Sequence, residues 1–356
     1  MKHLTSYELM KLVEEIGFLI NSRFEKAFQE NDEIYLRFDT KPKTILKISI
    51  PNYICITKDS PKDFIGVSKT IRALFKNQRL ISIKQLNFDR ILELGFNTKK
   101  IIIELFDKGN IVICDNEDKI LFLLRNENLN RKFKTGEKYA VPEKIDPFLI
   151  SKNEFLEAFN NKNKELVKFL ASDLGFGGVY AEELCLNSCI DKNKRFLSDE
   201  EVEILLSKIQ ELKKRDKKPM IVYENNIPID AVPVELKFYE GKERVFFEDY
   251  SSALEEFYKI TKKEVVDKEE EKILKAIEIQ KQGINKIIEE QKEIDFVINF
   301  IYQNFQELNQ LFEIVRKIIK EPITNKEKEE KIKSTNKFNI CEINFKEKFL
   351  ILEVKE

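Results

Sequence analysis

Asp89 and Arg90 are side chains of opposite charge that stand next to each other between runs of apolar, strand-like residues. Neighbours on a strand point to opposite faces of a sheet, so the two cannot bond to each other unless the backbone bulges or turns there. Arg90 can donate two parallel hydrogen bonds to a phosphate or a base edge, whereas Asp89 can only accept them. The pair therefore suits recognition of a nucleic acid. The alternative, which these residues alone favour, is that Asp89 caps a turn and Arg90 pairs with a distant carboxylate.

Basic residues are concentrated around this pair. Between positions 41 and 90, Lys and Arg outnumber Asp and Glu by eleven to three, although the whole chain carries a net charge of -1. A sustained positive surface attracts phosphate backbones because it releases their counterions. A solvated surface without a ligand is the usual alternative, and composition alone supports the two interpretations equally.

The chain contains a single histidine, His3, and five cysteines, none of them in a C-x-x-C pair. These residues leave no plausible zinc site, no Cys–His dyad away from the N-terminus and no histidine general base in a core. We therefore expect neither a metal nor another cofactor. The sequence shows no charged-then-apolar leader and no long uncharged apolar run, which predicts a cytoplasmic protein with reduced thiols.

The first part of the chain predicts strands with few helices. An amphipathic helix is expected over 5–21, with Ser6 as its N-cap, because its apolar residues recur at helical spacing. Alternating runs then predict a mostly antiparallel sheet, interrupted by one basic helix over 64–77. Gly109 is expected to supply a positive φ in a hairpin turn of this sheet.

From about residue 153 the pattern changes to helices, and three glycines lie in a turn between two of them. Gly175, Gly177 and Gly178 belong to the segment LGFGGVYAEEL. Two helices joined in this way resemble a helix-hairpin-helix, whose glycine turn lets backbone N–H groups approach a phosphate. An ordinary turn between packed helices explains the same residues and is favoured by the sequence alone. Ser198 and Glu201 predict a capping box at the last of these helices, before strands return from residue 218.

The most regular pattern lies between residues 273 and 319. Apolar residues recur at alternating spacings of four and three, and twelve of the fourteen positions in the two series are apolar. This pattern is typical of a coiled-coil helix, about 70 Å long at 1.5 Å per residue. Such a helix needs a second helix against its apolar side, which a homodimer mate or a separate chain could supply. A charged link over 323–337 and a small terminal hairpin are expected to follow.

The order of several segments resembles the NFACT family of ribosome-associated quality-control factors, whose older name is fibronectin-binding-like proteins. The matching segments are RALFKNQRLISIKQLNFDRILELGF (72–96), IIIELFDKGNIVICDNEDKILFLLR (101–125), EKYAVPEKIDPF (137–148), LGFGGVYAEEL (174–184) and VFFEDYSSALEEFY (245–258). The resemblance implies an α+β fold: a mostly antiparallel N-terminal domain similar to that of formamidopyrimidine-DNA glycosylases, a helix-hairpin-helix insert and a long coiled-coil helix.

The resemblance divides the chain into five segments. It implies an NFACT-N domain formed by 1–152 and 218–260, a helical domain at 153–217, a coiled-coil helix at 261–321 and part of a middle domain at 322–356. The family's C-terminal NFACT-R part and the returning half of its coiled coil are not found in this sequence. The partner helix is therefore expected from a homodimer mate or from a separate chain that contains NFACT-R.

The resemblance also implies a function. Family members bind a large ribosomal subunit that carries a peptidyl-tRNA, and they recruit tRNA, chiefly alanyl-tRNA, so that an untemplated tail is added. The expected partners are therefore the large ribosomal subunit, tRNA and rRNA. Peptide-bond chemistry would belong to the ribosome, so we expect no enzyme activity in this chain.

Residue by residue, the family's paired Asp-Arg for tRNA recruitment matches Asp89 and Arg90. With this match, contact with tRNA is favoured over a turn cap and a distant ion pair. A third acid of the family matches Glu8, where the family commonly has Asp. The family's basic helix is matched by Arg72, Lys76 and Arg79. We also expect phosphate contacts from Lys84 and from the glycines of the turn at Gly175, Gly177 and Gly178.

Two other functions compete with this one. A structural coiled-coil protein with a nonspecific RNA-binding N-terminal domain would share the helix and the basic residues. A DNA glycosylase is not expected, because enzymes of that kind depend on an N-terminal Pro followed by Glu, and this chain begins Met1, Lys2, His3.

Overall fold

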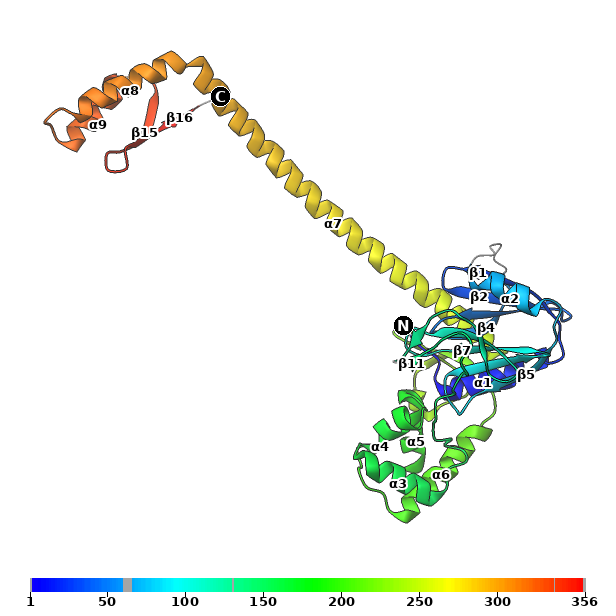
Figure 1. The fold of residues 1–356 in the computed structure, drawn as a ribbon. Helices are drawn as coiled ribbons and strands as arrows, with labels where there is room; N and C mark the ends of the chain where they lie inside the picture. Colours follow the sequence, from blue (N-terminus) through cyan, green and yellow to red (C-terminus); the bar gives the residue numbers. More distant parts are fainter. Residues whose placement is uncertain (1, 60–65, 130, 336, 355–356) are drawn as a thin grey trace. The chain divides into compact units, whose positions relative to one another are not determined.

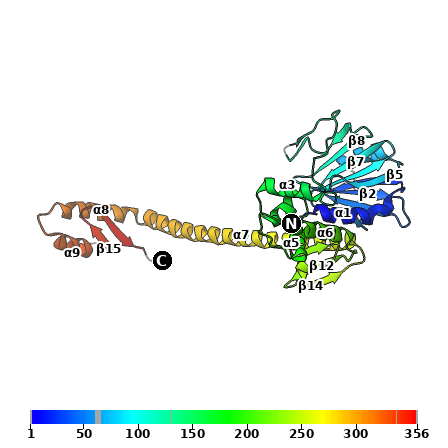
Figure 2. The same ribbon diagram turned by 90° about the horizontal axis from the view of Figure 1, so that it is seen from below.

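The chain folds into two compact units, Met1–Val265 and Val266–Glu356. The computed structural model describes residues 2–59, 66–129, 131–335 and 337–354, with side chains described outside 263–272. Figures 1 and 2 show the elements from two directions. The first unit combines antiparallel sheets with a group of helices, so the predicted α+β class is confirmed.

Two antiparallel sheets form most of the first unit. The four-stranded sheet has the order β1-β2-β3-β4 and the five-stranded sheet the order β5-β6-β7-β8-β9. Their strands are β1 (Phe24–Glu30), β2 (Glu33–Phe38), β3 (Thr44–Ser49), β4 (Tyr53–Thr57), β5 (Leu80–Gln85), β6 (Ile91–Phe96), β7 (Lys99–Glu104), β8 (Asn110–Asp115) and β9 (Ile120–Leu123). The pattern did not predict β1, because a register shift between Phe24 and Lys26 interrupts its alternation. Gly109 has a φ of 68° in the β7–β8 hairpin, as predicted.

Two helices pack on these sheets. Helix α1 (Ser6–Ile16) is capped by Thr5, whose side chain accepts from the Glu8 N–H while the Glu8 side chain accepts from the Thr5 N–H. The prediction of Ser6 as the N-cap was wrong by one residue, because only Thr5 has a glutamate three positions later. Helix α2 (Val67–Phe75) packs on β1, and the predicted start of this helix at 64 lies outside the described residues.

A helical group and a small sheet complete the first unit. The helices are α3 (Lys152–Lys162), α4 (Leu166–Lys168), α5 (Gly178–Ser188) and α6 (Asp199–Lys214); the strands are β12 (Met220–Glu224), β13 (Ile227–Val232) and β14 (Glu243–Phe246), with a two-stranded ribbon of β10 (Glu127–Asn128) and β11 (Arg131–Lys132) before them. The capping box of Ser198 and Glu201 opens α6 as predicted. One helical turn of α4 is followed by a wider, π-helical turn over Phe169–Asp173, where a single helix was expected.

Three aromatic rings join the helical group to the five-stranded sheet. Phe88 follows β5, Phe148 precedes α3, and Phe176 lies in the glycine turn before α5. Their ring centroids lie 4.9 Å (Phe88–Phe148), 5.4 Å (Phe88–Phe176) and 5.9 Å (Phe148–Phe176) apart, in edge-on arrangements that aromatic rings prefer. All three side chains are buried. This cluster therefore brings three segments that are distant in the sequence to one place.

The long helix α7 (Tyr250–Gln303) begins in the first unit, where Leu254 and Phe257 join the core, and it continues into the second. The second unit also holds α8 (Phe305–Ile319), α9 (Asn325–Thr335), β15 (Asn339–Asn344) and β16 (Phe349–Glu353). The helix expected over 261–321 is thus interrupted at Asn304, and the expected charged link forms α9. The terminal hairpin of β15 and β16 is present as predicted. Among the described residues, no helix is both long and apolar enough to cross a lipid bilayer.

Replacing Phe176 with alanine should lower the free energy of unfolding of the first unit by about 3 to 5 kcal/mol, because it empties the centre of the aromatic cluster. Urea unfolding followed by circular dichroism measures this change. Phe196→Ala is the matched control, because the side chain of Phe196 is 77% exposed, and it should change stability by about 0.5 kcal/mol at most. Equal midpoints for the two variants would contradict the described packing.

Candidate functional site

Asp89 and Arg90 follow a tight turn between β5 and β6. Asn87 and Phe88, the two residues before them, have positive φ angles of 49° and 45°, and the Asp89 N–H donates to the Leu86 carbonyl over 2.9 Å. Positive φ at both central residues is the geometry of the tight turns that suit the twist of a hairpin. The backbone thus turns immediately before the pair, so strand alternation does not govern the directions of its side chains.

Several contacts hold this turn in place. A phenylalanine at positive φ costs about 1 to 2 kcal/mol, and the aromatic cluster around Phe88 offsets that cost. Gln85 donates from Nε2 to the carbonyls of Ser6, over 2.7 Å, and Asp89, over 2.8 Å. Asn87 donates from Nδ2 to the Pro142 carbonyl over 3.0 Å. The turn is therefore fixed to the N-terminal segment and to the loop before α3.

The carboxylate of Asp89 is buried, with the residue 4% exposed. Its Oδ1 accepts from the Lys144 Nζ over 2.6 Å and from the Arg90 backbone N–H over 2.7 Å. The Lys144 side chain is 32% exposed, so this ion pair lies at the edge of the protein interior. Asp89 was predicted to contact RNA directly, and the structure instead directs its carboxylate towards Lys144.

Arg90 has a different environment, because its half-buried side chain lines an open cleft. Among the described residues, no carboxylate forms an ion pair with its guanidinium and no group accepts a hydrogen bond from it. Burial lowers the pKa of Arg90, and the negative charge of Asp89 opposes that shift. A partly desolvated guanidinium without a protein acceptor is the arrangement that an anionic ligand would complete.

The cleft has a volume of about 400 Å³ and is bounded by four separate parts of the chain. Besides Arg90, it is lined by His3, Leu4, Thr5, Ser6, Lys144, Ala171, Ser172, Gly175 and Gly177. Burial lowers the pKa of His3, and the positive charge of Arg90 lowers it further. The cleft thus combines two cationic side chains with three hydroxyls and an imidazole, a set of groups suited to phosphate.

The glycine turn forms one wall of the cleft, and it packs so closely against the N-terminal segment that a larger residue would not fit at Gly177. Gly175 and Gly177 have φ angles of 77° and 80°, and a Cβ atom on Gly177 would lie 2.5 Å from Cγ2 of Thr5. The N–H of Gly177 donates to the Ala171 carbonyl over 3.0 Å, so it is already used within the protein. This bond argues against the predicted phosphate contact through that N–H. Gly178 opens α5 and is not among the residues that line the cleft.

A second cleft is lined in part by residues of the predicted basic helix. It has a volume of about 420 Å³ and is lined by Glu25, Lys26, Lys69, Arg72, Ala73 and Lys76 on β1 and α2. Glu25 is bound by Arg37, over 2.7 Å, and Lys43, over 2.5 Å. Four of the six residues that line this cleft are cations and one is an acid.

Two of the predicted phosphate contacts lie outside both clefts. Arg79 donates from Nη1 to the Asn21 carbonyl over 2.8 Å. Lys84 is exposed on β5, paired across the sheet with Glu93. The structure thus brings Arg72 and Lys76 together, but it joins neither Arg79 nor Lys84 to them or to Arg90.

Glu8, the third predicted tRNA contact, is fully buried in an ionic network, with 1% of the residue exposed. It accepts from Lys2 Nζ over 2.6 Å, from the Thr5 N–H over 2.8 Å and from the Tyr180 hydroxyl over 3.1 Å. Lys2 also pairs with Asp230. Burial raises the pKa of Glu8, and the Lys2 ammonium opposes the shift. Glu8 therefore supports the N-terminal segment from inside and does not line the cleft.

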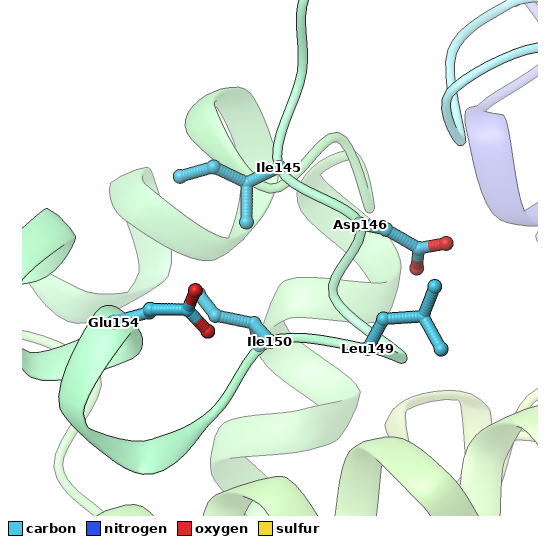
Figure 3. Close-up of a pocket in the computed structure, with 5 residues that line it drawn as sticks. All are labelled: Ile145, Asp146, Leu149, Ile150 and Glu154. Carbon is cyan, nitrogen blue, oxygen red and sulfur yellow. The ribbon is translucent and has the colours of Figure 1, made fainter.

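A third pocket, close to Lys144 in the sequence, has a different character. Figure 3 shows its lining side chains, Ile145, Asp146, Leu149, Ile150 and Glu154. Asp146 accepts from the Phe148 N–H over 2.9 Å, and Glu154 completes the capping box of α3 with Ser151. With two carboxylates and no cation in its lining, this pocket repels phosphate and does not belong to the candidate site.

Comparison with known proteins agrees with this organisation. Residues 5–337 match the family described as NFACT N-terminal and middle domains. The chain belongs to the NFACT family. This NFACT chain is 32% identical, over 88% of its length, to "Archaeal Rqc2 homolog aRqcH" of Methanocaldococcus jannaschii, and it covers 52% of that protein. It is 25% identical to "Ribosome quality control complex subunit NEMF" of Homo sapiens over 84% of the chain and 31% of that protein. The NFACT chain thus spans about half the length of the archaeal relative.

Solved structures support the fold of the NFACT chain. The fibrinogen binding protein from Staphylococcus aureus matches 71% of the chain and 98% of its own length, with a TM-score of 0.59 at 20% identity. The N-terminal part of the fibronectin/fibrinogen-binding protein from Streptococcus suis matches 72% of the chain and 99% of its own length, with a TM-score of 0.58 at 20% identity. At this level of identity the likeness concerns the fold alone.

Replacing Glu8 with glutamine should lower the free energy of unfolding by about 1 to 3 kcal/mol, because Lys2 loses one of two buried carboxylate partners. Chemical denaturation measures the change. Glu14→Gln on the same helix is the control, since the Glu14 side chain is 45% exposed, and should have an effect of at most about 0.5 kcal/mol. If Glu8 were a ligand contact and not a structural residue, E8Q would be as stable as E14Q.

Proposed function

We propose that this NFACT chain is a ribosome quality control factor that binds the large ribosomal subunit in the cytoplasm and recruits tRNA. The names of its relatives support the assignment to ribosome quality control. The one observation that carries RNA binding is the Arg90 guanidinium, which faces a polar cleft without a protein acceptor among the described residues. Structural arginines normally have such an acceptor, because desolvated donors cost free energy when they are left unpaired.

The recruited molecule is proposed to be a tRNA, in agreement with the family's use of the Asp-Arg pair. The cleft supplies charge and hydrogen-bond donors, which recognise a folded RNA through its phosphates. In the proposed function Arg72 and Lys76, with Lys69 and Lys26 beside them, contact a second stretch of phosphate backbone, of tRNA or of rRNA. Which amino acid the tRNA carries, proposed from the family to be alanine, would be decided by RNA contacts beyond these two clefts.

The contribution to tailing would be one of position and not of chemistry. Neither cleft contains a carboxylate pair or an activated nucleophile among the residues that line it. A protein that holds an aminoacylated tRNA in place removes much of the entropic cost of bringing two reactants together. The ribosome would then form the peptide bond.

Arg90→Ala should reduce the affinity for tRNA about 10-fold or more, because a charge-assisted contact to phosphate is lost. Binding is measured by filter retention or by fluorescence anisotropy, with purified protein and bulk tRNA over a series of salt concentrations. The plot of log affinity against log salt concentration has a negative slope. The magnitude of this slope should decrease by about 0.9 for each phosphate contact that is removed.

Arg195→Ala serves as the control, because the Arg195 side chain is 53% exposed, pairs with Glu165 and lines neither cleft. It should bind tRNA as the unchanged protein does. A protein that binds no tRNA, or whose affinity barely changes with salt, would instead be the structural coiled-coil protein with an incidental basic surface.

A second part of the proposal concerns a partner helix for α7. The seven apolar residues of the two series that lie on α7 are all exposed by 42% to 63%: Ile273, Ile277, Ile284, Ile287, Ile294, Ile298 and Ile301. Val315, which continues the pattern in α8, is buried in the core of the second unit with Ile332 and Ile340. Phe305, Phe312 and Ile319 of the same series in α8 are exposed as well. The longest uninterrupted part of the apolar seam lies on α7. We propose that it pairs with a helix of a homodimer mate or of a separate NFACT-R-containing chain.

Ile287→Asp should disrupt this pairing, because it puts a charge into an apolar seam. Gel filtration with light scattering measures the mass, which for a homodimer is twice the chain mass of 42.2 kDa. Gln282→Asp introduces the same charge on the opposite side of α7 and should leave the mass unchanged. A protein that is monomeric before mutation excludes the homodimer, and the separate chain is then tested by mixing it with each variant.

A further inference from the structure

Lys144 was not singled out by any sequence pattern, yet it is the second cation of the cleft. It lies in the loop between β11 and α3, and its Nζ is 2.6 Å from Oδ1 of Asp89. That loop is held beside the turn by the bond from Asn87 to the Pro142 carbonyl and by the packing of Phe148 against Phe88. The position of Lys144 is therefore defined at three points, which is unusual for a lysine on a loop.

The charges of the cleft indicate what it holds. Arg90 and Lys144 supply two positive charges against one negative charge from Asp89, so one positive charge is left without a counterion among the lining residues. The carboxylate lies on the protein side, buried, while the lysine is one-third exposed. An RNA phosphodiester carries a single negative charge and would neutralise the cleft.

We propose that Arg90 and Lys144 bind one phosphodiester of an RNA between them, and that Asp89 is a positioning residue that holds Lys144 and does not touch the RNA. This inference rests on the proposed function and specifies its site. It also explains why an acid belongs in a site for a polyanion. A lysine side chain has several rotatable bonds, and the fixed carboxylate behind it selects the conformation that directs the ammonium to the ligand.

Asp89 could contact the RNA directly or could act through Lys144, and single variants do not distinguish these two roles. If Asp89 accepts hydrogen bonds from bases or riboses, its loss and the loss of Lys144 weaken binding independently. If Asp89 acts through Lys144, its loss has no further effect once Lys144 has been removed. A double-mutant cycle measures this difference directly.

The experiment compares Asp89→Asn, Lys144→Gln, the double variant and Arg90→Ala in the full chain, with bulk tRNA as the probe at several salt concentrations. We expect D89N, K144Q and the double variant to lose affinity by about the same factor, about 10-fold, each with a salt slope lower by about 0.9. Lys144→Arg should restore most of the affinity, because a guanidinium also reaches both the carboxylate and a phosphate. Lys134→Gln changes an exposed lysine of the same loop, and this matched control should bind normally.

Circular dichroism and the urea midpoint of each variant show whether a loss of affinity reflects unfolding. A double variant that binds much more weakly than K144Q would overturn the positioning role, because Asp89 would then contact the RNA itself. If K144Q binds tRNA as tightly as the unchanged protein while R90A binds it more weakly, Lys144 does not share a phosphodiester with Arg90. The proposed function would still stand. An unchanged chain that binds no tRNA would overturn the proposed function and this inference with it.

Discussion

A carboxylate withdrawn from water needs a counterion and hydrogen-bond donors, and the neighbourhood of Asp89 supplies both. Lys144 provides the charge and the Arg90 backbone provides an N–H. Burying an unpaired carboxylate would cost several kcal/mol, on the order of the stability of a whole domain. The turn after β5 and the loop before α3 must therefore stay together, which keeps Lys144 beside Arg90 in the lining of the cleft.

The same constraint applies at the N-terminus. Lys2, Glu8 and Asp230 form a buried ionic network that joins the first residues of the chain to α1 and to β13, and the Tyr180 hydroxyl adds a link to α5. His3, Thr5 and Ser6 follow directly and line the cleft. The buried network thus holds one wall of the cleft in place. An acid that resembles a ligand contact in the sequence is a structural support in the fold.

In the second unit some apolar residues form a core, while others remain exposed on α7. In α8, Leu311, Val315 and Ile318 form a small core with Ile332 of α9 and Ile340 of β15. On α7, the isoleucines of the same heptad pattern remain exposed. Exposed apolar residues at this spacing favour contact with another helix, which is the basis of the proposed pairing.

Apart from the α+β class, which the family resemblance implied, the sequence by itself determined the antiparallel strands, the Gly109 hairpin, the capping box of α6 and the terminal hairpin. These depend on local periodicity and turn chemistry, which neighbouring residues are enough to specify. It did not determine β1, whose bulge hides its alternation, or the break at Asn304.

For the site, the sequence singled out Asp89 and Arg90, but only the tertiary structure decided that one is buried and the other faces a cleft. Lys144 is 55 residues from Asp89 along the chain, and no spacing rule connects them. The glycine turn before α5 also depends on a contact that no local pattern predicts, because Thr5, which approaches Gly177 closely, is distant from it in the sequence. Local patterns fix elements because backbone geometry is local, whereas the ionic partners of a buried charge are chosen by packing between distant segments.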